Sequence, residues 1–211
     1  MTPEASRPPD PTRRNQRSHR AILDATFKLI ARNGYAKVTI EAIASAAKVG
    51  KPTIYRWWPS KGALALDAIN DRIGHVLDFP DTGNIAGDLV HQINEVIALF
   101  NSDVGTAFQG VIAEGQGDRS VAASFRDTVV EPRIRACQDR LAKAVAAGQL
   151  RNDVPTRAMT EMLYAPLYYR LLLGTDPLTT ADSAALVERA LEGLRPTSAP
   201  SPASDPLAAS P

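Results

Sequence analysis

Apolar residues along most of this 211-residue chain recur every three or four positions, which is the spacing of one face of an α-helix. The first such segment covers about residues 17–33. Leu23, Phe27 and Ile30 share one of its faces, and Gly34 is placed to end it with a positive φ. No segment shows the alternation of apolar and polar residues that marks a strand. The pattern therefore predicts an all-α protein.

Two short helices joined by a tight turn are expected next. Thr39 is placed to cap the first helix, which ends near Ala47. The second helix begins at Lys51 and must end by Trp58, because a residue that precedes a proline is pushed out of helical conformation. A pair of this size, with a glycine in the connection, has the dimensions of a helix-turn-helix.

Six longer helical segments follow, the first of them capped by Ser60. Their expected ranges are 60–77, 84–101, 104–114, 121–147, 156–173 and 180–194. Pro132 should mark a kink or a boundary in the fourth of these segments, and Pro166 lies inside the fifth. The two ends of the chain, residues 1–15 and 196–211, hold many prolines and few apolar residues, so we expect both to be disordered.

The overall composition, with 44% hydrophobic and 22% charged residues, is that of an ordinary globular protein. The net charge of +1 conceals an asymmetry: twelve of the 24 Lys and Arg but only four of the 23 Asp and Glu lie in residues 1–61. A basic N-terminal part beside an acidic remainder points to a polyanionic partner for the first part alone. Chance clustering of charges on solvated faces is the alternative.

The location of the protein is expected to be cytoplasmic. The N-terminus has no apolar stretch behind its charges, so it does not look like a secretory signal. No apolar run approaches the roughly 18 to 20 residues that cross a bilayer, which predicts no membrane partner. Cys137 is the one cysteine, so no internal disulfide can form, which suits a reducing compartment.

Both tryptophans of the chain stand side by side among lysines and an arginine, in the stretch VGKPTIYRWWPSKGAL. If Ile54 and Trp58 face the core, Trp57 lies about 100° round the helix and cannot share that face. Trp58 is therefore predicted to be core and Trp57 surface. An outward aromatic beside Arg56 suits contact with a thymine methyl or a sugar, although Trp57 alternatively covers the edge of a neighbouring domain.

The segment TIEAIASAAKVGKPTIYRWWPSKGAL resembles the DNA-binding signature of the TetR family of bacterial one-component regulators. The resemblance covers about residues 17–66 and includes the Gly34–Tyr35 pair and the aromatic residue before Pro-Ser-Lys. Further along, TGNIAGDL, EPRIRACQDRLAKAVAAGQLRND and APLYYRLLLG resemble one common C-terminal subtype. The resemblance implies a helix-turn-helix domain over residues 16–62. A connecting helix would join it to an effector-binding and dimerisation domain over residues 63–195.

The resemblance also implies roles for individual residues of the DNA-binding part. Phosphates would be bound by Thr39, Tyr55 and Lys61. Base edges would be read by Lys51, Thr53, Arg56 and Trp57. The basic arm, with Arg13, Arg14 and Arg17, is a weaker candidate for contact with an adjacent groove, because such tails are often only solvated. The expected partner is double-stranded DNA with a palindromic operator sequence.

In the C-terminal part, a group of apolar and aromatic residues is expected to line an effector cavity. They are Phe100, Phe108, Phe125, Met159, Met162, Leu163, Tyr164 and Tyr168. Each of them taken singly is more simply explained as core packing. Tyr168, Tyr169 and Arg170 would supply polar contacts or serve a subunit interface. The family pairs two subunits through the last two helices, which predicts a homodimer.

Catalytic chemistry finds no support in the sequence. His19, His75 and His91 lack the spacing of metal ligands, and GVIAEGQGD lacks the Gly-Lys-Ser/Thr of a phosphate-binding loop. We therefore expect no enzyme, metal or cofactor, and a repressor that a small apolar or aromatic effector releases from DNA. The main alternative is a DNA-binding regulator without an effector, controlled by a protein partner or by its own concentration. A helical enzyme or scaffold is a more distant possibility.

Overall fold

The computed structural model describes residues 11–74 and 78–196, and this part of the chain contains helices and no strand. Its α-helices are α1 (Pro11–Asn33), α2 (Ile40–Ala47), α3 (Lys51–Tyr55), α4 (Lys61–Ile73), α5 (Ile85–Phe100), α6 (Asp103–Gly117), α7 (Arg119–Phe125), α8 (Glu131–Ala146), α9 (Thr156–Leu173) and α10 (Ser183–Glu192). Three short segments are η1 (Tyr35–Lys37), the π-helix η2 (Arg126–Val130) and η3 (Thr180–Asp182). The predicted all-α class is confirmed.

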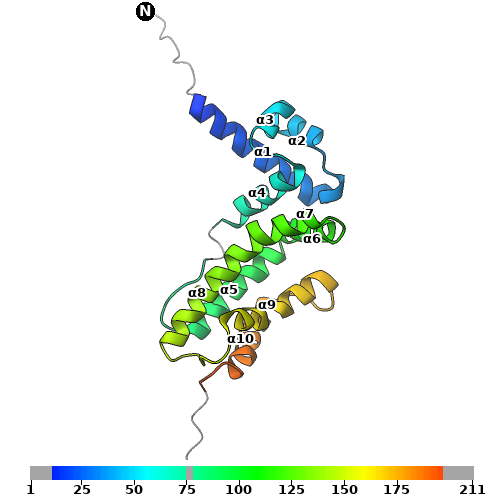
Figure 1. Ribbon diagram of the computed structural model, residues 1–211. Helices are drawn as coiled ribbons and strands as arrows, with labels where there is room; N and C mark the ends of the chain where they lie inside the picture. The colour runs from blue at the N-terminus through cyan, green and yellow to red at the C-terminus, as the bar shows by residue number, and fades with distance from the viewer. Residues whose placement is uncertain (1–10, 75–77, 197–211) are drawn as a thin grey trace, which may run out of the picture.

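The helices form two groups joined by α4 (Figure 1). One group holds α1, α2 and α3 at the end of the molecule where the chain begins. The other group holds the longer helices, in which α8 packs on α9 and α10 packs on both α5 and α9. The two groups also touch directly, because α6 packs against α1, η1 and α4. The predicted connecting helix is thus one of several contacts between the two ends of the molecule.

Side-chain caps explain where several helices begin. The hydroxyl of Thr39 accepts a hydrogen bond from the backbone N–H of Ala42, and the hydroxyl of Ser60 accepts one from Ala63. Each cap satisfies a backbone donor that the first turn leaves unpaired, and each contributes about 1 kcal/mol. Both predicted caps are confirmed.

The start of α1 and the end of α4 differ from the expectation, whereas α3 ends before Trp58 as expected. α1 begins at Pro11, so residues 11–15 are helical rather than part of a disordered arm. α3 ends at Tyr55, and Trp57 and Trp58 follow it in a turn whose N–H groups both bond to the carbonyl of Ile54. α4 ends at Ile73. Leu77 and His75, with residues 1–10 and 197–211 of the expected arm and tail, lie outside the described residues.

The segment expected as one helix over residues 121–147 is divided into α7, η2 and α8. Within η2 the backbone winds more loosely, and the N–H of Glu131 bonds to the carbonyl of Arg126, five residues earlier. Pro132 then occupies the first turn of α8, where its missing N–H costs nothing. Pro132 therefore marks a boundary, as expected, but the π-helix before it was not predicted.

The corner between α5 and α6 brings two backbones into close contact. A Cβ atom on Gly105 would lie 1.9 Å from the carbonyl oxygen of Phe100, so only glycine fits there. The two helices meet at an angle of 77°. Among the described residues no single helix is long and apolar enough to cross a membrane, and this bent pair meets the criteria of length and composition only together.

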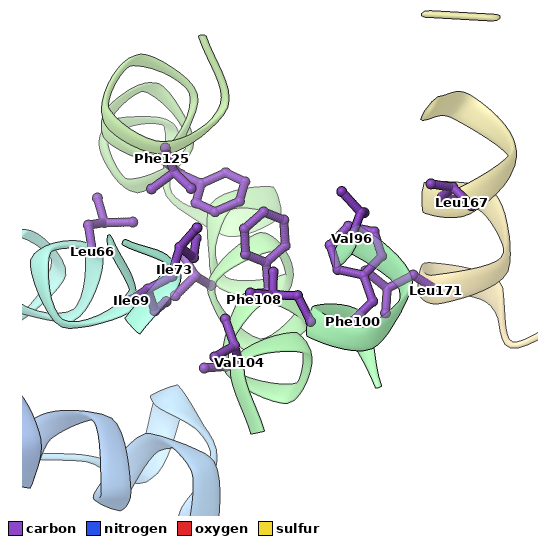
Figure 2. Packing of buried hydrophobic residues seen from close by; sticks show 14 of the residues in the cluster. Leu66, Ile69, Ile73, Val96, Phe100, Val104, Phe108, Phe125, Leu167 and Leu171 are labelled. Carbon is purple, nitrogen blue, oxygen red and sulfur yellow. The ribbon is translucent and has the colours of Figure 1, made fainter. Parts of the chain in front are cut away.

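A single apolar core runs through both groups of helices. Figure 2 shows its middle, where Ile69 and Ile73 of α4 face the rings of Phe108 and Phe125. Phe108 packs edge-on against Phe125, with ring centroids 4.7 Å apart, and also lies 5.7 Å from Phe100 of α5. The connecting helix therefore shares its buried face with the core of the C-terminal group.

Candidate nucleic-acid interface and ligand cavity

α2, α3 and the turn between them form the expected helix-turn-helix. The turn opens with Lys48, the one non-glycine residue with positive φ (55°) in the described part of the chain. Ile43 of α2 and Ile54 of α3 are completely buried, which turns one face of each helix toward the core. The opposite face of α3 is left to solvent.

The two adjacent tryptophans point in different directions, as the helical spacing predicts. Trp58 is only 4% exposed, and its indole N–H donates to Asp67 of α4 at 2.9 Å. Trp57 is 45% exposed. The ring of His19 from α1 lies against both of them, with centroids 5.1 Å from Trp57 and 4.8 Å from Trp58. Trp58 thus anchors the turn after α3, while Trp57 remains available to a partner.

The residues expected to read bases lie together on the exposed side of α3 and the turn after it. Lys51, Arg56 and Trp57 are exposed and Thr53 is partly exposed. Lys51 forms an ion pair with Glu41 of α2, with Nζ 3.1 Å from Oε1. This contact lies on the surface, where an ion pair contributes little, so a DNA phosphate or base can compete for the lysine.

The residues expected to bind phosphates lie at the rim of the same surface. Thr39 is exposed at the start of α2, and Tyr55 is 53% exposed on α3. Lys61 is held more firmly: its Nζ donates to the carbonyl oxygen of Tyr35 at 3.2 Å and lies 4.2 Å from the centre of the Tyr35 ring. An ammonium group has three donors, so the bond to Tyr35 leaves others for a phosphate.

Tyr35 connects this surface to the C-terminal helices. Its side chain is 4% exposed and packs beside Gly110 of α6, where an added Cβ would lie 3.5 Å from the Cβ of Tyr35. Burial and the nearby carboxylates of Glu114 and Asp118 raise the pKa of the Tyr35 hydroxyl, which stays neutral. The sequence pointed to Tyr35 only as part of the family signature.

A cavity of about 260 Å³ lies among the C-terminal helices. Its wall is almost entirely apolar and is built from α4, α5, α6, η2, α8 and α9, with Phe79 from the loop before α5. The lining residues are Ile73, Phe79, Gln92, Val96, Leu99, Phe100, Phe108, Val129, Val130, Arg133, Ile134, Cys137, Thr160, Glu161, Tyr164, Ala165 and Tyr168. Of the residues expected there, the structure places four in the wall: Phe100, Phe108, Tyr164 and Tyr168.

The other four expected residues lie elsewhere. Phe125 packs behind Phe108 and does not reach the cavity. Met159 and Leu163 are fully buried on another face of α9, and Met162 is 45% exposed on the outside of that helix. The sequence shows that a helix is apolar, whereas packing decides which of its apolar side chains face a cavity.

The polar residues of the cavity wall were missed, apart from the two tyrosines. Tyr164 donates its hydroxyl to the side-chain carbonyl of Gln92. Burial raises the pKa of Tyr164 well above its ordinary value, that of Tyr168 to about 12 and that of the Cys137 thiol to about 11. All three groups are therefore neutral near pH 7, so Arg133 and the exposed Glu161 supply the charges of the wall.

Two protein-family models match most of the chain. Residues 22–68 match the model of "bacterial regulatory proteins, tetR family", and residues 79–190 match a "tetracyclin repressor-like, C-terminal domain". YdeS of Bacillus subtilis strain 168, an uncharacterized HTH-type transcriptional regulator, is 33% identical over 186 residues, which cover 88% of this chain and 94% of YdeS.

Solved structures agree with this assignment. The TetR family transcription regulator SCO0332 is 33% identical with a TM-score of 0.73, covering 85% of this chain and 99% of its own. The flavonoid-responsive regulator FrrA is 25% identical with a TM-score of 0.66, covering 87% of this chain and 100% of its own. The exposed helix-turn-helix, the helical C-terminal group and these likenesses lead to one conclusion: the chain belongs to the TetR family of DNA-binding transcriptional regulators, which are not enzymes.

Proposed function

We propose that this regulator is a repressor that binds a palindromic operator as a homodimer and leaves it when a small apolar molecule occupies the cavity. Its recognition surface is the exposed side of α3 and the following turn, with Lys51, Arg56 and Trp57 directed toward bases. Thr39 and Lys61 lie at helix N-termini beside that surface, where backbone N–H groups and the helix dipole favour a phosphate.

The homodimer is assigned to the outer face of α9. Four large apolar side chains are exposed along it, namely Met162, Tyr169, Leu172 and Leu173. An exposed apolar stripe of this kind marks an interaction site. A twofold partner would hold two copies of α3 about 34 Å apart, which is the spacing of successive major-groove half-sites.

One observation carries the proposed response to an effector: the cavity wall includes Ile73 of α4. α4 begins at Lys61, directly beside the recognition surface, so a molecule in the cavity touches the helix that positions that surface. The flavonoid-responsive relative FrrA supports a small-molecule effector. The competing proposal, a regulator without an effector, would leave this cavity without a role.

DNA binding is tested with an operator selected from random duplexes by the full-length protein. If a dimer contacts six to eight phosphates, the plot of log K against log salt should have a slope of about −5 to −7. Lys61→Ala should flatten that slope, whereas Arg56→Ala should relax preference at one position of each half-site. Equal loss by Arg56→Ala on operator and random DNA would contradict its role in reading bases.

The effector response is tested by calorimetry of candidate ligands with and without bound operator. A swing from mostly bound to mostly free DNA requires about 5.5 kcal/mol of differential ligand binding, which two sites can share. Linkage requires the operator to weaken ligand binding by the same total factor. Ligands that bind equally in both titrations are not inducers, and failure across a broad apolar library would favour the regulator without an effector.

A further inference from the structure

Arg133 of α8 is an unusual part of the cavity wall, because it is a cation in an apolar surface. Its two terminal nitrogens each donate to the side-chain oxygen of Asn70 at 3.2 Å, and one also donates to the carbonyl of Val129. Its Nε is buried and has no hydrogen-bond partner among the described residues. Both terminal nitrogens of the guanidinium are therefore bonded, while the covered Nε donor is left over.

No carboxylate in the described part of the chain balances this charge. Glu161, the acid at the cavity, is exposed and pairs with Arg157 at 3.5 Å. Burial lowers the pKa of Arg133, which reflects the cost of removing its charge from water. By contrast, Arg140, seven residues further along the same helix, is buried against Asp88, with its Nη2 2.5 Å from Oδ2 of Asp88. Arg133 is partly buried, and a cation removed from water without an anion beside it is costly, so an anionic ligand is favoured there.

We propose that the cavity selects apolar molecules that carry one carboxylate or similar oxyanion, and that Arg133 binds that group. This inference rests on the proposed effector site and names the chemistry of its ligand. A guanidinium offers two parallel N–H donors to a carboxylate, and the unbonded Nε belongs to such a pair. The apolar wall accommodates the remainder of the molecule, and the neutral hydroxyls of Tyr164 and Tyr168 do not repel an anion.

The same arginine connects the ligand to α4. Asn70 of α4 accepts from Arg133 and also donates its amide to the carbonyl of Thr128 in η2 at 3.1 Å. Because Nε is covered in this structure, a carboxylate reaches it only when the guanidinium turns. When the guanidinium turns, its hydrogen bonds to Asn70 change, and the contact of α4 with α8 and η2 changes with them. Asn70 is thus a positioning residue between the cavity and the connecting helix.

Selectivity is tested by calorimetry on the full-length protein with acids and their primary amides, using benzoate, naphthoate, octanoate and decanoate. At least one acid should bind about thirtyfold more tightly than its amide, as expected for a charged hydrogen-bonded pair. Arg133→Met should reduce this ratio to about threefold or less while the amide still binds. Arg135→Met, which removes an exposed cation two residues away, is the matched control and should keep the ratio.

Three results would overturn the proposal: equal binding of every acid and its amide, an unchanged ratio in Arg133→Met, or no binding by any acid. If amides bind and release the protein from DNA but acids do not, the proposed effector function stands and only the anionic ligand is ruled out. If the protein binds acids through Arg133 but binds no operator DNA, the anion site stands and the proposed repressor function is ruled out.

Coupling is tested with Asn70→Ala, which removes the acceptor that holds the guanidinium. Acid affinity should rise about tenfold because the acid no longer competes with Asn70, and amide affinity should stay unchanged. The acid should also release operator DNA less completely from this variant than from the wild type. Unchanged acid affinity and unchanged release would contradict a role for Asn70 in the coupling.

Discussion

At the scale of single residues, buried charge is the most informative feature of the C-terminal helices. Arg140 is 4% exposed and meets Asp88, which is 2% exposed. Thr82 donates to Asp88 through both its hydroxyl and its backbone N–H. Burial alone would raise the pKa of Asp88, but these hydrogen bonds and those from Arg140 outweigh it, so the pKa is lowered below 3.8. The pair joins α5 to α8, and the bonds of Thr82 to Asp88 and of Arg140 to the carbonyl of Pro80 hold the loop before α5 against both helices.

We predict that Asp88→Asn lowers the free energy of unfolding by about 3 kcal/mol, because it removes the buried anion of Arg140 and leaves only the half-exposed carboxylate of Asp81, 3.6 Å from Nε. Asp81→Asn removes a half-exposed carboxylate that pairs with Lys143 at 2.8 Å and with Arg140 at the longer distance of 3.6 Å, and it should cost less than about 1 kcal/mol. Urea denaturation of both variants at pH 7 measures the difference. Equal, small effects would show that the buried pair is not needed.

The same carboxylate predicts a pH dependence. A lowered pKa means that the unfolded chain takes up a proton more readily than the folded one, so this stabilisation is present above the ordinary value of 3.8 and disappears as the pH falls through the folded pKa. Denaturation of wild type and Asp88→Asn from pH 7 to pH 2 should give curves that converge at the acidic end. Curves that stay parallel would assign the acid sensitivity to other carboxylates.

At the scale of elements, local spacing determined what the sequence could reveal. The faces of Trp57 and Trp58 follow from helical geometry within one short segment, and the exposures of 45% and 4% confirm them. Caps at Thr39 and Ser60 are equally local. The cavity depends instead on how six elements pack, so the sequence could not show that four of the eight expected residues lie outside its wall and that Arg133 lies in it. The sequence before Pro132 also gave no pattern from which the π-helix η2 could be predicted.

The two tryptophans should separate stability from DNA binding. We predict that Trp58→Ala lowers the free energy of unfolding by about 3–5 kcal/mol, since it removes a buried ring and its bond to Asp67. Trp57→Ala should leave the melting temperature nearly unchanged while weakening operator binding. Thermal denaturation and DNA titration of the two variants form a matched pair. A stable Trp58→Ala protein would contradict the anchoring role.

The corner between α5 and α6 gives a second prediction at this scale. Gly105→Ala should lower the free energy of unfolding by at least about 2 kcal/mol, because its Cβ would lie 1.9 Å from the carbonyl oxygen of Phe100. Gly110→Ala in the same helix meets only ordinary contacts and should be neutral or stabilising by up to about 1 kcal/mol. Equal free energies of unfolding for the two variants would contradict a steric requirement for glycine at position 105.

At the scale of the whole molecule, the exposed stripe on α9 determines the choice of variants for testing the dimer. Leu191 of the last helix is 7% exposed, so a charge there would disturb folding as well as association. Leu173 is 63% exposed and Tyr169 is 57% exposed, so both can be changed without disturbing the core of one subunit.

If the proposed dimer forms through this stripe, Tyr169→Glu combined with Leu173→Glu should give a folded monomer and lower operator affinity by at least about a hundredfold, because each subunit then binds a single half-site. Sedimentation gives the mass, and circular dichroism checks the fold. His91→Glu, an exposed substitution on α5, is a control that should remain dimeric. A dimeric double variant would place the subunit interface elsewhere.

The contact between Tyr35 and Gly110 has a consequence for how regulators of this kind can be recombined. Tyr35 is buried against α6, and its backbone carbonyl accepts a hydrogen bond from Lys61 at the edge of the recognition surface. In a chimera that exchanges only the first 62 residues, α1 and η1 from one protein would have to pack against α6 from the other, and the two surfaces would not match. Transplanting specificity for a new operator calls for replacing the exposed side of α3 alone, or for carrying the facing turn of α6 along with the graft.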